Sequence, residues 1–288
     1  MNLKMIQVVF IMKKNSIVAI IYDFDKTLAT DDMQNFSFIP ALGMTNAEFW
    51  GATGDLTKET GMEKILSYMY MMIEKCKEKN IPLTKEYLNK LGKDVKFFEG
   101  VTTWFKRINA YAEELGITVE HYIVSSGTKE IIEGTSIVKE FKEIYACEFL
   151  YDKDGIATWP KIAINYTAKT QFLFRISKGV LDSQDDVGVN SRTSTRRIPY
   201  RNIIYIGDGL TDIPCMTLVK EKGGKSIAIY PKGKKERVYP LFEEERVNYI
   251  CRGDYTTNSD IEKIVKLIIS QVSILNILAN KEQYLLKR

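Results

Sequence analysis

The sequence predicts an α/β protein built on a doubly wound parallel sheet, with a small helical cap domain inserted into it. Runs of β-branched and apolar residues at 17–22, 117–124 and 202–207 are typical of strands buried on both faces. Helical patterns alternate with the later strands, which favours a parallel sheet. A long helical stretch without strands directly follows the first strand. At 288 residues the chain can hold such a core and an accessory domain.

Composition narrows the functional classes. Apolar residues make up 45% and charged residues 27%, which is typical of a globular protein with a normal core. The net charge of +4 is too small to indicate a nucleic-acid partner, although it would not repel an anionic substrate. The four cysteines lie far apart and the chain has one histidine. We therefore expect no disulfide framework and no zinc site, and a reducing cytoplasm as the location.

Two apolar stretches could suggest a membrane or an export signal. Residues 5–12 are apolar, but Lys13 and Lys14 follow them without a small-residue cleavage site, and Met12 could itself be the start of the protein. Residues 264–279 are interrupted by polar side chains and are too polar to span a bilayer. We therefore expect neither secretion nor a membrane partner.

The first strand ends in two carboxylates. Asp23 and Asp25 follow residues 17–22 at a spacing of two. Carboxylates this close repel each other unless a cation or a proton lies between them, so the pair implies a metal, a shared proton or both.

The segment from 31 to 99 is predicted to form the helical cap, leaving 1–30 and 100–288 as the core. Thr45-x-x-Glu48 and Thr60-x-x-Glu63 resemble capping boxes that open helices, and another helix is expected over 84–91. Glycines are expected to break the region into short helices: Gly43, Gly51, Gly54 and Gly61. A methionine-rich stripe from Met62 to Cys76 has helical spacing and is interpreted as core packing.

After residue 100 the predicted elements alternate. The sequence predicts a helix over 101–115, a hairpin over 147–164, a helix from Thr167, and further strands over 226–230 and 247–251. Residues 180–201 lack periodicity and are expected to form a mobile loop. A final helix after Ser259 is expected to turn these apolar residues inward: Ile261, Ile264, Val265, Ile268, Val272 and Leu275.

Three of these strands are predicted to bring polar residues to one place. Asp23, Ser125 and Asp208 each follow a buried strand, and the carboxyl ends of parallel strands meet at one edge of the sheet. Asp23, Asp25, Asp208 and Asp212 would then form an oxygen-rich cluster suited to Mg²⁺. Each aspartate alone could be a solvated turn residue. Two motifs at the ends of apolar strands, Asp23-x-Asp25 and Gly207-Asp208-Gly209-x-x-Asp212, together favour an active site.

A lysine at a helix start could neutralise a phosphoryl oxygen, and Lys169 is the first candidate, with Lys178 in reserve. His121 lies within the second strand and is interpreted as a packing residue rather than a base. Trp50 is expected in the core, and neither it nor Arg107 can be assigned to a substrate.

Four of these features resemble the motifs of the haloacid dehalogenase-like (HAD) superfamily, in that family's order. Asp23-x-Asp25-x-Thr27-Leu28 is similar to the first motif, Ser125 to the second and Lys169 to the third. Gly207-Asp208-Gly209-x-x-Asp212 resembles the fourth. The segment between the lysine and the acidic motif is longer here than in most members, which leaves the choice between Lys169 and Lys178 open.

The resemblance implies a Rossmann-like core and a magnesium-dependent phosphomonoester hydrolase that acts on a small phosphorylated metabolite. Asp23 would be the nucleophile that forms an aspartyl-phosphate, and Asp25 the acid and base. Ser125 and Lys169 would bind phosphoryl oxygens. Asp23, the Asp25 carbonyl and Asp208 would hold the metal, and Asp212 would orient its water shell or Lys169.

Alternatives remain at this point. A phosphotransferase or phosphomutase would keep both aspartates of the first motif, whereas dehalogenases of the family lack the second. A module that binds a phosphorylated ligand without turnover would belong to a different class. The presence of both Asp23 and Asp25 makes this alternative less favoured, because loss of either would be expected in such a module. The sequence names neither the substrate nor the oligomeric state.

Overall fold

The fold is organised by a seven-stranded sheet. The structure is a computed structural model, and it describes residues 16–192 and 195–286. The strand order is β4-β3-β2-β1-β5-β6-β7. The strands are β1 (Ser16–Tyr22), β2 (Ile117–Thr128), β3 (Glu143–Tyr151), β4 (Ala157–Ile162), β5 (Ile203–Gly207), β6 (Lys225–Tyr230) and β7 (Tyr249–Arg252).

The first strand lies at the centre of this sheet. β1 pairs in parallel with both β2 and β5, so that Tyr22 lies opposite Ile123 on one side and Ile206 on the other. β4 alone among the seven strands is antiparallel, because it returns from β3 as the predicted hairpin. The mostly parallel sheet confirms the predicted fold class and brings the carboxyl ends of β1, β2 and β5 to one edge.

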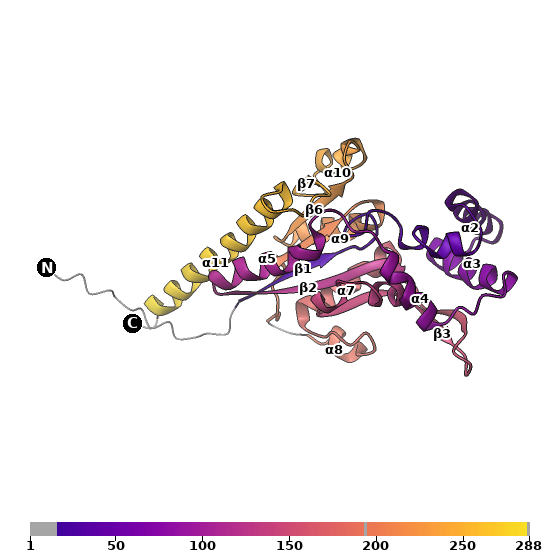
Figure 1. Cartoon of the computed structure of the whole chain (residues 1–288). Helices are drawn as coiled ribbons and strands as arrows, with labels where there is room; N and C mark the ends of the chain where they lie inside the picture. Colours follow the sequence, from indigo (N-terminus) through magenta and orange to yellow (C-terminus); the bar gives the residue numbers. More distant parts are fainter. Residues whose placement is uncertain (1–15, 193–194, 287–288) are drawn as a thin grey trace.

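Helices cover both faces of the sheet (Figure 1). On one face α5 (Val101–Glu114) packs against β2, and α11 (Asp260–Leu286) packs against α5, β1 and β7. On the other face α7 (Tyr166–Lys178) packs against β2, and α9 (Ile213–Glu221) against α7, β5 and β6. Shorter helices complete this part of the chain: α6 (Lys129–Glu133), α8 (Asp186–Asn190) and α10 (Tyr239–Glu243).

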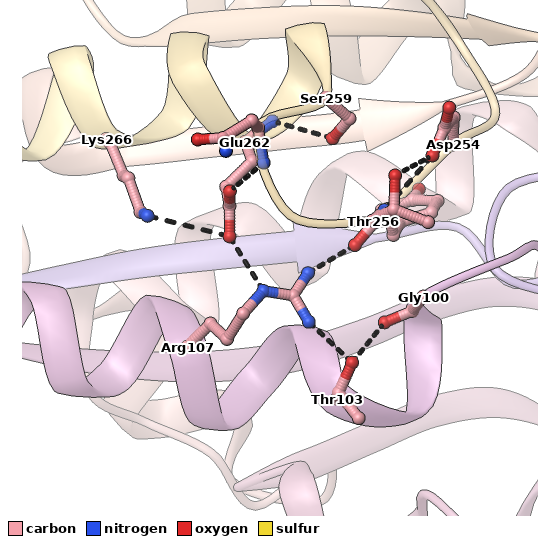
Figure 2. A network of polar contacts seen from close by, with 10 residues as sticks. Gly100, Thr103, Arg107, Asp254, Thr256, Ser259, Glu262 and Lys266 are labelled. Carbon is pink, nitrogen blue, oxygen red and sulfur yellow. Dashed lines mark hydrogen bonds and ion pairs between the residues drawn. The ribbon is translucent and has the colours of Figure 1, made fainter.

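A polar network joins α5 to the start of α11 (Figure 2). Arg107 Nε donates to Glu262 Oε1 at 2.8 Å, and its guanidinium also contacts Thr103 and the carbonyl of Tyr255. Glu262 is almost fully buried, and its other oxygen accepts from the Asn258 backbone at 2.6 Å. Arg107 is thus held in a structural ion pair.

Four helices follow β1 and lie at the opposite end of the molecule from the free end of α11 (Figure 1). They are α1 (Phe38–Ala41), α2 (Asn46–Thr60), α3 (Lys64–Glu78) and α4 (Lys85–Leu91). Thr45 forms the predicted capping box with Glu48 at the start of α2, and Thr84 caps α4.

Two predictions about these helices were wrong. The Thr60 to Glu63 motif is not a capping box, because Thr60 is the last residue of α2 and Glu63 itself is the N-cap of α3. Gly51 and Gly54 lie inside α2 and do not break it, whereas Gly43 and Gly61 adopt positive φ after α1 and α2.

The chain enters and leaves this helical segment at one place. Thr30 N donates to Lys96 O at 2.8 Å, and Ala29 forms an antiparallel bridge with Phe97. α4 packs closely against α6 at two glycines. A Cβ on Gly134 would lie 1.7 Å from Asn89 O, and a Cβ on Gly92 would lie 2.3 Å from Ile131 O. α3 packs against β4.

The described part of residues 180–201 is mostly a loop, as predicted, but a short helix interrupts it. This helix is α8, and Arg175 donates to the carbonyls of Asp182 and Asp185 at 2.8 and 3.1 Å. Ile198, near the other end, is fully buried. Missing periodicity therefore did not mean missing structure, because contacts with α7 organise the described part of this segment.

The last helix also departs from prediction at one residue. Leu275 is 45% exposed, because α11 extends past the part of the protein that its first half packs against (Figure 1).

The predictions about residues 5–14 lie outside the described residues. Within the described chain, every helix is too short or too polar to cross a bilayer.

Candidate active site

Three neighbouring strands deliver polar side chains to the carboxyl edge of the sheet. Asp23 follows Tyr22 at the end of β1, Ser125 lies near the end of β2, and Asp208 follows Gly207 at the end of β5. The parallel register places these positions side by side. The predicted convergence of Asp23, Ser125 and Asp208 is therefore what the fold produces.

Lys169 lies directly behind this edge, in the first turn of α7. Its Nζ is 2.8 Å from Asp23 Oδ1 and 2.7 Å from Asp212 Oδ1, and the residue is fully buried. Burial lowers the pKa of Lys169, but Asp212 and Asp23 outweigh burial and hold the pKa above its usual value. The lysine is thus a fixed cation between two carboxylates.

Lys178, the alternative lysine, lies elsewhere. Its Nζ donates to the carbonyls of Val189 and Ser191 at 2.5 and 2.7 Å, in the segment that contains α8. Of the two candidates, the structure brings only Lys169 to the aspartates.

Asp212 is held from three sides. Its Oδ1 accepts from Lys169 and from Tyr205 Oη, the latter at 2.7 Å, and its Oδ2 accepts from the Asp208 backbone at 3.3 Å. Gly207 makes this placement possible, because a Cβ there would lie 2.5 Å from Asp212 Oδ2. Asp212 therefore positions Lys169, which is one of the two roles expected for it.

The acidic cluster has the chemistry of a site for a hard cation. Carboxylate oxygens of Asp23, Asp208 and Asp212 lie within 4.8 Å of one another. Burial, together with repulsion from Asp23 and Asp212, raises the pKa of Asp208 to about 8. Burial likewise raises the pKa of Asp23 to about 6, despite the opposing effect of Lys169. Oxygen donors that repel one another fit Mg²⁺, which would neutralise them.

Asp25 stands apart from this cluster. Its Oδ1 accepts from Met33 N at 2.8 Å, at the start of the 3-10 helix η1 (Met33–Asn35). Burial raises the pKa of Asp25 well above its usual value, and Asp32 and Asp23 raise it further. A carboxyl group with a raised pKa keeps its proton to a higher pH, which suits it to act as a proton donor. Its carboxylate is not among the three that lie together, and the expected metal ligand from this residue was its backbone carbonyl.

Ser125 is buried beside the aspartates. Its Oγ accepts from Gly127 N at 3.0 Å, which leaves the hydroxyl hydrogen free to donate to a ligand. A Cβ on Gly127 would lie 2.9 Å from Asp25 Oδ2, so the absence of a side chain at this position keeps the site open next to the carboxyl.

A cavity of about 640 Å³ opens over this edge and is roofed by the helices that follow β1. Its floor includes Asp23, Asp25, Ser125 and Asp208. From α2 and α3 it is lined by Trp50, Thr53, Gly54, Thr57, Lys58, Lys64, Ile65 and Tyr68. Tyr68 also donates to Ser126 O at 2.7 Å, which ties α3 to the end of β2.

Trp50 was predicted to be core, but it is only partly buried and lines this cavity. Its Nε1 donates to Asn35 Oδ1 at 2.9 Å, which fixes the ring at the cavity wall. The sequence also gave no sign of Tyr205, whose contact with Asp212 depends on the turn between them, or of Arg237, which lines the cavity from the 3-10 helix η6 (Lys235–Arg237).

His121 is a packing residue, as predicted. It is buried, and its ring bonds to Tyr22 Oη at 3.0 Å and to Asn109 Oδ1 at 2.9 Å. Trp104 Nε1 donates to the same tyrosine oxygen at 2.8 Å. Burial lowers the pKa of His121 to about 3, so the ring stays neutral at physiological pH. It does not line the active-site cavity.

Fold and site together define a Rossmann-like α/β protein with an acidic site at the carboxyl edge of its sheet. Residues 20–217 match the family model of haloacid dehalogenase-like hydrolases, and the chain belongs to this family. The resemblance seen in the four motifs is thereby confirmed.

The sequence identity between this chain and individual relatives is low. An uncharacterised protein of Borreliella burgdorferi is 28% identical over 275 residues, covering 86% of this chain and 95% of that protein. A phosphoserine phosphatase, solved as an analogue of its phospho-aspartyl intermediate, has a TM-score of 0.55 at 19% identity and covers 88% of this chain and 99% of its own. A HAD family hydrolase from Salmonella enterica serovar Typhi has a TM-score of 0.54 at 17% identity, covering 81% of this chain and 66% of its own. These two structures establish the shared fold.

Proposed function

We propose that this protein is a magnesium-dependent phosphomonoester hydrolase that acts on a small phosphorylated metabolite through an aspartyl-phosphate. The observation that carries the proposal is the pairing of Asp23 with Lys169, next to an Asp25 whose pKa is raised. A carboxylate held in place by a buried cation is suited to attack phosphorus, and a neighbouring protonated carboxyl is suited to assist the leaving group.

In the first step, an oxygen of Asp23 attacks phosphorus while the bond between phosphorus and the ester oxygen breaks. Asp25 gives its proton to that oxygen, and the alcohol leaves. In the second step, Asp25 takes a proton from a water molecule, whose oxygen attacks the phosphorus of the aspartyl-phosphate. The acyl-phosphate bond breaks, and phosphate and the original Asp23 carboxylate result. Ser125 and Lys169 stabilise the phosphoryl oxygens in both steps.

Asp23, Asp208 and the Asp25 carbonyl would hold the metal, and Asp212 keeps Lys169 in place beside them. The bound ion supplies electrostatic stabilisation of the phosphoryl charge. Asp212 reaches the same cluster, but its contacts with Lys169 and Tyr205 give it mainly a positioning role.

Residues 1–30 and 100–288 would form the core domain and residues 31–99 the cap. Ala29 and Thr30 lie antiparallel to Phe97 and Lys96. This contact supports the division, because the segment that leaves the core and the segment that returns to it lie side by side there. The cap would exclude bulk water and select the alcohol part of the substrate. The four free, buried cysteines fit a reducing cytoplasm.

The test is hydrolysis of para-nitrophenyl phosphate with Mg²⁺ and with a chelator. Turnover should need the metal, and Asp23→Asn should abolish it. Asp25→Asn should lower kcat by about 10²–10⁴-fold, the usual contribution of an acid and base. Asp94→Asn is the control, because Asp94 is exposed and does not line the cavity.

Borohydride trapping followed by mass spectrometry should locate an acyl-phosphate on Asp23. Full activity of Asp23→Asn would contradict the proposal. Faster transfer of the phosphoryl group to an added alcohol than to water would instead make the protein a phosphotransferase.

A further inference from the structure

We propose that the substrate is a phosphate monoester whose alcohol part carries a second anionic group, bound by Lys64 and Arg237 at the rim of the cavity. This inference rests on the proposed function of the same site and names its substrate class. Two observations support it: how the charged residues are distributed around the cavity, and which of the basic ones form an ion pair with a carboxylate.

The acidic residues of the cavity lie in the segments that follow β1 and β5. They are Asp23, Asp25, Asp32 and Asp208. The part of the lining that comes from α2 and α3 has no acidic side chain; its charged members are Lys58 and Lys64. The cavity is therefore acidic at its floor, where the phosphoryl group and metal would bind, and basic where α2 and α3 cover it.

The four basic residues of the lining differ in their partners. Lys26 Nζ lies 2.5 Å from Asp32, and Lys58 Nζ lies 3.4 Å from Asp55. Lys64 and Arg237, by contrast, form no ion pair within 4.0 Å with any carboxylate in the described part of the chain. Both are exposed, so each can turn its charge toward a ligand.

The two unpaired cations come from separate parts of the fold. Lys64 is the first residue of α3, and Arg237 is the last residue of η6, which follows β6. Their meeting at one cavity is therefore not a local run of like charge on one element. Basic groups around a cavity attract anions and concentrate them there.

The phosphoryl group itself does not need these two residues. In the proposed mechanism Ser125, at the floor of the cavity, and Lys169, buried behind it at 2.8 Å from Asp23 Oδ1, bind that group. A cavity of about 640 Å³ also lies within the range of roughly 300–1,000 Å³ that small-molecule sites show, so it has room for more than a phosphoryl group. A second anion on the alcohol part would match the cations that remain.

Two matched substrate pairs test this inference and distinguish the two sources of a second anion. 3-Phosphoglycerate has a carboxylate where glycerol 3-phosphate has a hydroxymethyl group. Fructose 1,6-bisphosphate has a second phosphate where fructose 6-phosphate has a hydroxyl group. The anionic member of at least one pair should have a kcat/KM about tenfold higher, chiefly through a lower KM.

The variant Lys64→Gln/Arg237→Gln should bring this ratio close to one. Lys93→Gln/Arg201→Gln is the matched control, because these residues are exposed, do not line the cavity and remove the same net charge. The control should keep the wild-type ratio. A ratio near one in the wild type for both pairs, or an equal fall in both double variants, overturns the inference.

Failure of the proposed function is distinguishable from failure of this inference. If neither para-nitrophenyl phosphate nor any member of the pairs is hydrolysed, the proposed function fails. Titration calorimetry of the same pairs then decides the inference: tighter binding of an anionic member that is lost in Lys64→Gln/Arg237→Gln supports it, and equal binding within both pairs refutes it.

Discussion

Replacement of Lys169 by methionine tests the electrostatic design of the site. Methionine has a similar length, so Lys169→Met removes the charge with little change in packing. In the wild type this lysine is fully buried and bonds to Asp23 and Asp212 at 2.8 and 2.7 Å. Without it, two nearly inaccessible carboxylates face each other with no cation between them.

The expected loss of stability follows from this burial. Removing one partner of a buried ion pair costs about 3–5 kcal/mol, because the remaining charge stays buried and uncompensated. That is a large part of the roughly 5–15 kcal/mol by which a folded protein is stable. We therefore expect Lys169→Met to lower the free energy of unfolding by about 3–5 kcal/mol, and to remove phosphatase activity.

The assay is urea unfolding followed by circular dichroism at pH 7, in the presence of a chelator so that no metal replaces the lost charge. Lys58→Met is the control, since Lys58 forms an exposed ion pair with Asp55 at 3.4 Å and such pairs contribute about 1 kcal/mol or less. A loss for Lys169→Met no larger than that of the control would refute the reasoning.

Two further predictions concern stability away from the site. Burial raises the pKa of Glu120, but hydrogen bonds from Arg197, Lys142 and Tyr122 outweigh it and lower the pKa to about 2. Because the folded pKa is depressed below 4.5, this stabilisation is present above pH 4.5 and is lost as pH falls toward 2. Glu120→Gln should therefore be less stable than wild type by about 1–2 kcal/mol at pH 7, with a difference that shrinks on acidification in thermal melts; a difference independent of pH would contradict this. Gly134→Ala should cost about 2–3 kcal/mol in urea unfolding, because its Cβ would lie 1.7 Å from Asn89 O, whereas Gly51→Ala, with nothing within 4 Å, should be neutral or stabilising; equal effects would contradict the tight contact of α4 with α6.

Strand ends could be predicted because they depend on local pattern. An apolar run that stops at Asp23, Ser125 or Asp208 indicates both a buried strand and a polar residue at its end. Once the strands are taken as parallel neighbours, convergence at one edge follows from topology. The same local reasoning found the cap of α2 at Thr45, and it failed at Thr60, where two helices adjoin and the motif falls across their junction.

Residues 180–201 show what local pattern leaves out. Their polar composition predicted a loop, but Arg175 from α7 binds two of their carbonyls, and Arg197 binds Glu120 through both of its terminal nitrogens at 2.7 and 2.6 Å. These contacts join residues that are distant in sequence, and no periodicity in the segment itself reports them.

The sequence by itself determined the fold class and the residues at the ends of the central strands, since both follow from apolar periodicity and residue type. Only the tertiary structure decided between Lys169 and Lys178, because both are lysines of one helix and only its packing against the sheet edge turns one of them toward Asp23 and Asp212. It also brought Lys64 and Arg237 to one cavity. The physical reason is the same in each case: a charge acts on whatever lies within a few ångströms, and for these residues those neighbours come from distant parts of the chain.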